Sequence, residues 1–369
     1  MTHVVLDTRS LRQQRDGLAN YIEELVPRIV SAAPDLEFTI LANPSQMTFW
    51  TSAAPNSRVL PCDCRPMWPA QHWRIPLLLR RLSPDLYFYP VHDPPLFCPQ
   101  PFIFVIQDVI SHEIRPYYDN LDRLKTAYTR VVTAAGLRRA SMVLCSSHAT
   151  KTAVTSVFGH RLGHKLRVVP LGTTPSHSRL DAQILPSHLL YVGTDLPQKN
   201  LDRLISGYAK AQRQAKGRLP NLELVGALRH QADLQERAGR EGVGDSVQFR
   251  GHVSRPDLEA MYQSAIALVF PSVAEGFGLP ILEAMSRSVA VVTSNRSACA
   301  EVADTAALLV DPYSTDSIAN GLLTISTDAA LRQDLVRRGH SRVLAFSWDQ
   351  CAATTLDVIR EALRGTDGC

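Results

Sequence analysis

The stretch IALVFPSVAEGFGLPILE, residues 266–283, is the part of this sequence from which the fold can be predicted. Residues 266–270 are a short apolar run of the kind that forms a buried parallel strand, and residues 289–293 are a second one. Between them, Gly276 and Gly278 let the main chain approach a ligand closely, and a proline two residues later suits the first turn of a helix. The motif therefore lies at the carboxyl end of a strand, where open α/β sheets bind their ligands.

Two glutamates, Glu275 and Glu283, bracket this turn. With Glu275 in the loop and Glu283 in the helix, one acid stands at each end of the turn. The main-chain N–H groups of Phe277, Gly278 and Leu279 are expected to face an anion. We interpret the motif as a sugar-nucleotide site in which Glu275 accepts hydrogen bonds from sugar hydroxyls and Glu283 from ribose hydroxyls. The alternative is a loop glutamate and a helix glutamate that are both solvated and share no ligand.

Strands and helices alternate along the chain in the manner of two doubly wound α/β domains. The first helix is predicted over residues 18–30, whose apolar residues repeat at helical period, and a second over residues 121–140. We place the first domain at residues 1–173, a proline-containing polar linker at 173–186 and the second domain at 187–345. Further strands are predicted at residues 4–6, 37–41, 86–89, 102–106, 142–145, 168–169 and 189–192.

Six segments of the C-terminal half, taken together, resemble the retaining glycosyltransferases of family 4, which have the GT-B fold. In the family's order and spacing they are YVGTDLPQKNLDRLI (191–205), LELVGA (222–227), VQFRGHVSRPDLEAMYQSA (247–265), the Glu-x7-Glu segment (275–283), AEVADTAALLVDP (300–312) and FSWDQCAATTL (346–356). The resemblance implies two Rossmann-like domains that face a central cleft. It also implies an acceptor-binding N-terminal domain, a nucleotide-sugar-binding C-terminal domain, and a last helix, within about 348–369, that crosses back to the first domain.

The family pattern assigns roles to residues in both domains. Lys199, in PQKN, matches the lysine that contacts the donor diphosphate, and Gly193 joins it as a donor-binding candidate. Many relatives carry arginine where this chain has Gly193-Thr194-Asp195, which leaves Lys199 with fewer cationic helpers. Gly17, before the first helix, matches a glycine that approaches the donor phosphates and the acceptor; a simple loop-to-helix glycine is the alternative.

The clearest departure from the family is Gln107-Asp108, where many members have His-Asp near the reaction centre. Gln107 can donate and accept hydrogen bonds, but it cannot take up a proton near neutral pH. The family's proposed front-face mechanism still allows transfer, because the leaving phosphate can accept the acceptor's proton. His112 is a further catalytic candidate, with a surface-loop histidine as its alternative. Asp7 and Arg9 are expected to fix the loop after the first strand.

The composition limits the classes of protein to which this chain can belong. With 369 residues, 45% of them hydrophobic, the chain can form two domain cores, and it contains no apolar run of 18 residues. The first residues form a core-like strand without the pattern of a signal peptide, so we expect a cytoplasmic protein. The seven cysteines form no metal pattern, and we expect no metal ion and no cofactor besides the sugar-nucleotide co-substrate.

The net charge of +4 is unevenly distributed, because residues 1–173 hold 19 Lys and Arg against 13 Asp and Glu. Within that half, residues 67–81 mix aromatic, aliphatic and basic side chains that suit an anionic membrane surface on the inner face of the plasma membrane. The alternative is a helix packed on the core with solvated arginines. Nucleic-acid binding is not indicated, since no motif supports it. The residues proposed for membrane contact are Trp68, Trp73, Arg74, Arg80 and Arg81.

Together these features predict a metal-independent, retaining hexosyltransferase of polysaccharide or glycoconjugate biosynthesis. Family resemblance favours mannose from GDP-mannose as the donor and a growing glycan or a lipid-linked molecule as the acceptor. Two alternatives remain: a UDP-sugar epimerase of the same fold, and a catalytically silent sugar-nucleotide-binding partner of an active transferase. Conversion of a donor alone to its epimer would identify the first, and binding without turnover would identify the second.

Overall fold

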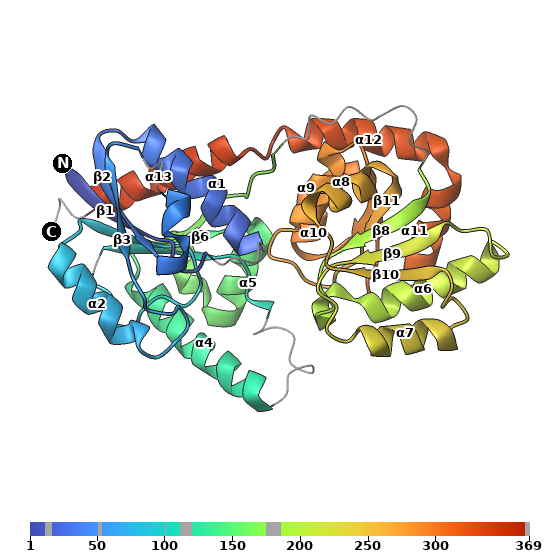
Figure 1. Ribbon diagram of the computed structural model, residues 1–369, viewed down its shortest axis with the longest axis horizontal. Coiled ribbons are helices and arrows are strands. Elements are labelled where there is room, and N and C mark those ends of the chain that lie inside the picture. Colours follow the sequence, from blue (N-terminus) through green and yellow to red (C-terminus); the bar gives the residue numbers. More distant parts are fainter. Residues whose placement is uncertain (12–16, 51–53, 100, 111–119, 175–185, 366–369) are drawn as a thin grey trace. The chain divides into compact units, whose positions relative to one another are not determined.

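The computed structural model of this chain contains two compact units (Figure 1). The first comprises Met1–Gly172 and Ser347–Cys369, and the second comprises Thr173–Phe346. Each unit is a parallel sheet covered by helices, which confirms the predicted class of two doubly wound α/β domains. The residues that the structure describes are 1–11, 17–50, 54–99, 101–110, 120–174 and 186–365, without the side chains of 120–123.

In the described part of the first unit, seven parallel strands follow the order β3-β2-β1-β4-β5-β6-β7. The predicted strands were confirmed to within about two residues at each end, because nearly all of them are apolar runs buried on both faces. The strand β3 was not predicted, since it lies at the sheet edge, is only partly buried and ends in a proline. The bounds are β1 (Thr2–Asp7), β2 (Leu36–Ala42), β3 (Ser57–Pro61), β4 (Leu86–Tyr89), β5 (Phe102–Ile106), β6 (Met142–Cys145) and β7 (Leu166–Val168).

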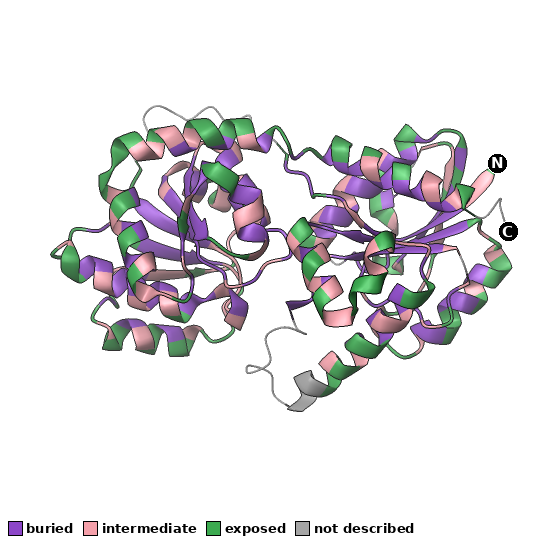
Figure 2. Cartoon of the chain, turned by 180° about the vertical axis from the view of Figure 1, so that it is seen from behind, coloured by how far each residue is buried: buried purple, intermediate pink, exposed green. Residues whose placement is uncertain are grey.

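Amphipathic helices cover this sheet with one face buried and the other exposed, as the purple and green faces in Figure 2 show. In the first helix the predicted apolar stripe was confirmed: Tyr21, Ile22, Leu25, Val26 and Ile29 are all buried. The helices and short 3-10 segments are α1 (Gly17–Ala32), η1 (Pro44–Trp50), α2 (Gln71–Leu82), α4 (Asn120–Arg139), α5 (His148–Phe158), η2 (His160–Lys165) and α13 (Trp348–Arg364).

The C-terminal helix α13 packs on α1 within the first unit. The rings of Trp348 and Tyr21 lie 6.3 Å apart, and Arg28 donates to the Asp349 carboxylate at 2.8 Å. The Ser347 side chain caps the helix by accepting from the main chain of Gln350. Family resemblance implied this crossing of the C-terminus back to the N-terminal half, which local sequence patterns did not indicate.

In the second unit, the described strands form a parallel sheet with the order β10-β9-β8-β11-β12-β13. From β8 the chain adds strands toward one edge of the sheet, through β9 to β10, and then toward the other edge, from β11 to β13. The loops after β8 and β11 therefore lead away from each other at a topological switch point. The strands are β8 (His188–Val192), β9 (Asn221–Val225), β10 (Val247–Gly251), β11 (Ala265–Phe270), β12 (Ala290–Ser294) and β13 (Leu308–Val310). The helical segments are η3 (Pro197–Lys199), α6 (Leu201–Gln214), α7 (Gln231–Arg240), α8 (Arg255–Gln263), α9 (Leu279–Ser286), α10 (Ser297–Ala303), η4 (Asp304–Ala306), α11 (Thr315–Thr327) and α12 (Ala329–Val343).

Candidate functional site

The predicted strand–turn–helix motif is present in the second unit. β11 ends at Phe270, and Glu275 lies in the following loop. Gly278 adopts a φ of 101° as the N-cap of α9, a conformation that an L side chain rarely adopts, which explains the glycine at this position. Pro280 falls in the first turn of α9, as its fixed φ and missing N–H favour. Glu283 lies on the helix itself.

Lys199 ends η3, immediately after the loop that follows β8. Its Nζ lies 2.7 Å from Oε1 of Glu275, and both side chains are largely buried, 17% and 10% exposed. The same Nζ lies 5.0 Å from the centre of the Phe270 ring. The fold therefore brings together, across the switch point, a lysine and a carboxylate that are 76 residues apart in the sequence.

The geometry of η3 is set by Asn200. This residue adopts a φ of 65°, and its Nδ2 donates to the carbonyl oxygens of Pro271 at 3.0 Å and Pro312 at 2.7 Å. One buried side chain thus ties the loop after β8 to the loops after β11 and β13. Asparagine suits this position because it tolerates the left-handed conformation better than most residues with a Cβ.

The second glutamate of the motif has a partner of its own. The hydroxyl of Tyr262, from α8, donates to Oε2 of Glu283 at 3.1 Å. Burial raises the pKa of Tyr262 well above its ordinary value, and the neighbouring Glu283 carboxylate adds to the rise. The phenol therefore stays protonated and holds the carboxylate as a hydrogen-bond donor. Sequence reasoning missed Tyr262, because nothing local links it to a glutamate 21 residues later.

The loops after β8 and β9 touch at glycines. The Gly193 N–H donates to the carbonyl of Val225 at 2.9 Å, and Gly226 has a φ of 134°. A Cβ on Gly226 would lie only 1.8 Å from the Gly193 carbonyl oxygen, and one on Gly193 would lie 2.6 Å from the Tyr191 hydroxyl. Gly193, which was predicted to bind the donor, thus also allows the loops after β8 and β9 to pack against each other. Gly226 was not identified from the sequence as important for this packing.

The turn between the two glutamates offers main-chain donors. Within the described residues, the N–H groups of Phe277 and Gly278 make no hydrogen bond. The Phe277 side chain is buried and packs edge-on against Phe346, with the ring centres 5.7 Å apart. Phe277 and Gly278 therefore have main-chain N–H groups to offer a ligand, as Leu279 was also predicted to do. Gly276, beside them, is buried.

The remaining candidates belong to the first unit. Gln107 follows β5, and its carbonyl oxygen accepts hydrogen bonds from Ser146 at 2.7 Å and Thr150 at 3.1 Å. Its side-chain Nε2 is buried and has no hydrogen-bond partner among the described residues. Asp108 accepts from the Ile110 N–H at 3.1 Å. Gln107 thus has a fixed main chain and an unused donor.

Two first-unit candidates, Gly17 and His112, lie at the edge of the described residues or outside them. Gly17 is the exposed first residue of α1, while the two residues before it are outside the described residues. The catalytic candidate His112 is also outside them. Gly17, Gln107 and Asp108 belong to the first unit, whereas Lys199 and Glu275 belong to the second.

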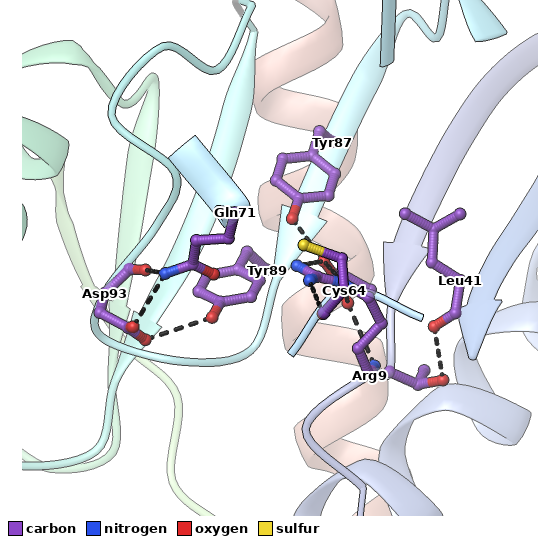
Figure 3. A network of polar contacts seen from close by, with 9 residues as sticks. Arg9, Leu41, Cys64, Gln71, Tyr87, Tyr89 and Asp93 are labelled. Atoms are coloured by element: carbon purple, nitrogen blue, oxygen red, sulfur yellow. Dashed lines mark hydrogen bonds and ion pairs between the residues drawn. The ribbon is translucent and has the colours of Figure 1, made fainter. Parts of the chain in front are cut away.

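Asp7 and Arg9, which were expected to fix the loop after β1, form a fully buried ion pair at 2.6 Å. Arg9 also donates to the carbonyl oxygen of Cys64 (Figure 3), and the Tyr87 hydroxyl donates to Asp7 at 2.5 Å. With both charges removed from water, each is compensated by the other and by further hydrogen bonds. The start of this loop is therefore anchored to β4 and to the segment before α2.

A second buried network in Figure 3 was not anticipated. Asp93 is fully buried and accepts from Gln71 Nε2 at 3.1 Å and from the Tyr89 hydroxyl at 3.2 Å. Burial raises the pKa of Asp93 above its ordinary value. Among the described residues, Oε1 of Gln71 has no hydrogen-bond partner. No sequence signal distinguishes this aspartate from a solvated one in a proline-rich loop.

The residues that the structure describes contain no group of three or more His, Cys, Asp or Glu side chains arranged to hold a metal ion. Every helix among them is too short or too polar to cross a membrane. The site in the second unit therefore consists of a lysine–carboxylate pair, a second carboxylate and main-chain N–H groups at the carboxyl edge of a parallel sheet, a set that suits a phosphorylated, hydroxyl-rich ligand.

Two parallel α/β units of this kind in one chain define the GT-B class of proteins, and solved structures agree. Sucrose-phosphate synthase from Thermosynechococcus elongatus is similar over 99% of this chain and 100% of its own, with a TM-score of 0.75 and 19% identity. Anabaena HepE in complex with UDP-glucose is similar over 98% of this chain and 100% of its own, with a TM-score of 0.72 and 15% identity. At these identities the likeness shows the fold.

Sequence comparison identifies the domain of the second unit. Residues 185–342 match the family described as glycosyl transferases group 1. The O-antigen chain mannosyltransferase B of Escherichia coli is 30% identical over 259 residues, and the O-antigen chain mannosyltransferase RfbU of Salmonella typhimurium is 26% identical over 244 residues. Each alignment covers 66% of this chain and 66% of the relative, slightly under two thirds of its length.

Proposed function

We propose that this protein is a retaining hexosyltransferase that moves mannose from GDP-mannose to a glycan or a lipid-linked acceptor in polysaccharide biosynthesis. The observation that carries the proposal is the Lys199–Glu275 pair at the switch point of a glycosyl transferases group 1 domain. The donor sugar is inferred from two relatives that are named as O-antigen mannosyltransferases.

For donor binding, we assign the diphosphate to Lys199 and to the main-chain N–H groups of residues 277–279. A lysine ammonium has three donors, of which one faces Glu275. Glu283 would accept hydrogen bonds from the ribose hydroxyls through the carboxylate that Tyr262 holds in place. Gly193 and Gly276 would let the main chain approach the ligand.

In the reaction, the bond between the anomeric carbon and the diphosphate oxygen breaks, and negative charge accumulates on the leaving diphosphate. Lys199 and the main-chain donors are held in place before the reaction, so they stabilise this charge without reorganisation. The diphosphate oxygen then takes the proton of the acceptor hydroxyl, which attacks from the same face and retains the anomeric configuration. Glu275 would fix the sugar by accepting from its hydroxyls. No metal ion is required for these steps.

In the first unit, we assign Gln107 and Asp108 to the sugar and the acceptor. The unused Nε2 of Gln107 supports this role, because a buried donor without a partner is costly unless a ligand supplies one. Gln107 would orient a sugar hydroxyl by hydrogen bonding and take no part in proton transfer. Gly17 is proposed to approach the donor phosphates and the acceptor, and His112 stays a catalytic candidate.

The test is a calorimetric binding screen against GDP-, UDP-, dTDP- and ADP-sugars; UDP-sugars belong in it because HepE was solved with UDP-glucose. Binding of one donor should be weakened by Lys199→Ala and by Glu283→Ala, and unaffected by Lys210→Ala, which removes an exposed lysine paired with Asp316. Binding that is indifferent to both site substitutions would refute the assigned site.

Turnover requires a separate assay. Transfer from the selected donor to extracted lipid-linked glycans should persist in EDTA, and NMR of the product should show the donor's anomeric configuration. Loss of Lys199 should lower the rate by at least one to two decades if one charge-assisted hydrogen bond of about 1.5–3 kcal/mol is lost. Release of an epimer from the donor alone would instead indicate an epimerase. Tight binding without any turnover would indicate a silent partner.

A peripheral contact with an anionic membrane at the inner face of the plasma membrane is part of the proposal. Helix α2 buries Ile75 and Leu79 on the core, while Trp73 and Leu77 on its other face are each about half exposed. The helix contains no acidic residue, and exposed arginines at 74, 80 and 81 flank the apolar groups. An interfacial helix combines apolar and basic side chains in this way.

The neighbouring helix α4 extends this surface. His72 on α2 and Tyr128 on α4 are hydrogen-bonded at 2.6 Å, so the two helices are joined. Helix α4 exposes Leu124 and Val131, which are seven positions apart and therefore share a face. Exposed basic residues accompany them at positions 125 and 130, and Trp68 precedes α2 with 55% of its surface exposed.

Sedimentation with vesicles of phosphatidylcholine with and without phosphatidylglycerol tests the membrane contact. The double substitution Trp73→Ala and Leu77→Ala should abolish sedimentation, and Arg80→Ala with Arg81→Ala should remove its dependence on phosphatidylglycerol. Leu344→Ala, which truncates an exposed leucine of the second unit, should change nothing. Equal sedimentation of all variants with these vesicles would refute the proposal that this surface contacts the membrane.

A further inference from the structure

Ser297 contacts both main-chain polar groups of Glu275 through one hydroxyl. Its Oγ accepts a hydrogen bond from the Glu275 N–H at 3.0 Å and donates one to the Glu275 carbonyl oxygen at 2.7 Å. Ser297 is the first residue of α10, which follows β12 after a short connection. It lies 22 residues beyond Glu275 in the sequence. A loop residue whose N–H and C=O are both bound in this way has its main chain fixed at that point.

The side chain of Glu275 is held separately. Its Oε1 contacts Nζ of Lys199 at 2.7 Å, on the segment that follows β8. The glutamate is therefore held at the main chain by the loop after β12 and at the carboxylate by the loop after β8. In the sheet, β8 and β12 lie on either side of β11, the strand that precedes the loop of Glu275.

Ser297 keeps a main-chain conformation that is unfavourable for its residue type. Its φ is 56°, in the left-handed region, where glycine would relieve the contact between Cβ and the main chain. Residues in such strained conformations are concentrated at functional sites. Glycine at this position would lack the hydroxyl that binds Glu275, which gives a physical reason for serine.

We propose that Ser297 is a positioning residue for glycosyl transfer: it holds the main chain of Glu275 so that the carboxylate meets the donor sugar in a fixed orientation. The inference rests on the proposed function, since it assigns Ser297 a role through Glu275 and no contact with substrate. In the proposed function the diphosphate is bound by Lys199 and not by Glu275, and Ser297 contacts only the main chain of Glu275. The loss of the hydroxyl should therefore lower kcat much more than it changes nucleotide binding.

Three substitutions separate positioning from mere stability. Ser297→Ala and Ser297→Gly both remove the hydroxyl, but glycine also relieves the strained φ. Ser297→Thr keeps the hydroxyl, while its β-branched side chain makes a positive φ less favourable. We therefore expect Tm to be lower for threonine than for glycine, and kcat to be higher for threonine than for glycine or alanine. Loss of two hydrogen bonds predicts a fall in kcat of about 10- to 100-fold.

The assay measures kcat and the donor KM with the sugar nucleotide selected by the binding screen, beside calorimetry with the free nucleoside diphosphate. Ser254→Ala, which removes the N-cap hydroxyl of α8 in the same unit, serves as the control and should retain kcat. If kcat follows Tm across the three variants, or if glycine is as active as the wild type, positioning by Ser297 is refuted. If the wild-type protein transfers no sugar at all, it is the proposed function that fails, and the inference with it.

Discussion

Substitution of Glu275 by glutamine is expected to strengthen the binding of a free nucleoside diphosphate while it weakens glycosyl transfer. In the structure, the Lys199 ammonium is engaged by the Glu275 carboxylate at 2.7 Å, with both side chains largely buried. An incoming diphosphate competes with this carboxylate for the same cation and is repelled by its charge. Glutamine has nearly the same shape, so the change removes the charge with little loss of packing.

The magnitude follows from the hydrogen bond that the ligand has to share or replace. A hydrogen bond to a charged group contributes about 1.5–3 kcal/mol, and bonds between two ionised groups are roughly twice as strong as neutral ones. Glutamine can still accept a hydrogen bond from Lys199, so about half of this stabilisation, on the order of 0.75–1.5 kcal/mol, is released to the ligand. At tenfold for each 1.4 kcal/mol, GDP should bind about 3- to 12-fold more tightly.

Isothermal titration with GDP and UDP measures this effect, with Tm and circular dichroism to establish that the variants are folded. Glu223→Gln is the matched control, because it also removes a carboxylate paired with a cation, Arg250, but on the strand β9. It should leave the nucleotide affinity unchanged. Unchanged or weaker binding of both nucleotides by a folded Glu275→Gln protein would refute the competition between carboxylate and diphosphate.

Three further outcomes are expected. Burial raises the pKa of Asp93 above its ordinary value of 3.8, so the folded state retains this proton more strongly than the unfolded state; the contribution to stability falls as pH rises from 3.8 through the raised pKa. Asp93→Asn should therefore flatten the decline in urea-unfolding free energy as the pH rises above 3.8, and an unchanged slope would contradict a raised pKa at Asp93. Gly226→Ala should destabilise the second unit by more than about 2 kcal/mol, because the new Cβ would collide with a main-chain oxygen. Gly244→Ala, whose Cβ would make only ordinary van der Waals contact, should be nearly neutral in thermal unfolding. Tyr262→Phe should weaken nucleotide binding about 2- to 10-fold in calorimetry, because it removes the hydrogen bond that holds the Glu283 carboxylate. Equal affinity of the variant and the wild type would show that this hydrogen bond does not contribute to nucleotide binding.

Local patterns in the sequence were sufficient for much of the fold. The strands at residues 102–106 and 142–145 are short apolar runs buried on both faces, and the first helix repeats apolar residues at helical period, so each is specified by its own residues. The turn at Gly278 is equally local, because its φ of 101° requires a residue without a Cβ. The edge strand β3 was missed because exposure on both sides leaves no apolar pattern.

The candidate site was only partly accessible from sequence. Glu275, Glu283 and Lys199 could be singled out as matches to a family motif. Their partners could not, since Tyr262 and Ser297 lie 21 and 22 residues from the groups that they hold, with no periodicity connecting them. The raised pKa of Asp93 could not be predicted either, because it results from burial and not from the residue type.

The sequence by itself determined which segments become strands, helices and turns, since these depend on side chains that are neighbours along the chain. Only the tertiary structure decided that β8 and β11 lie side by side, which brings Lys199 to within 2.7 Å of a carboxylate 76 residues away. The order of strands in a sheet depends on how whole elements pack and cross over, and local residue preferences carry little information about that arrangement.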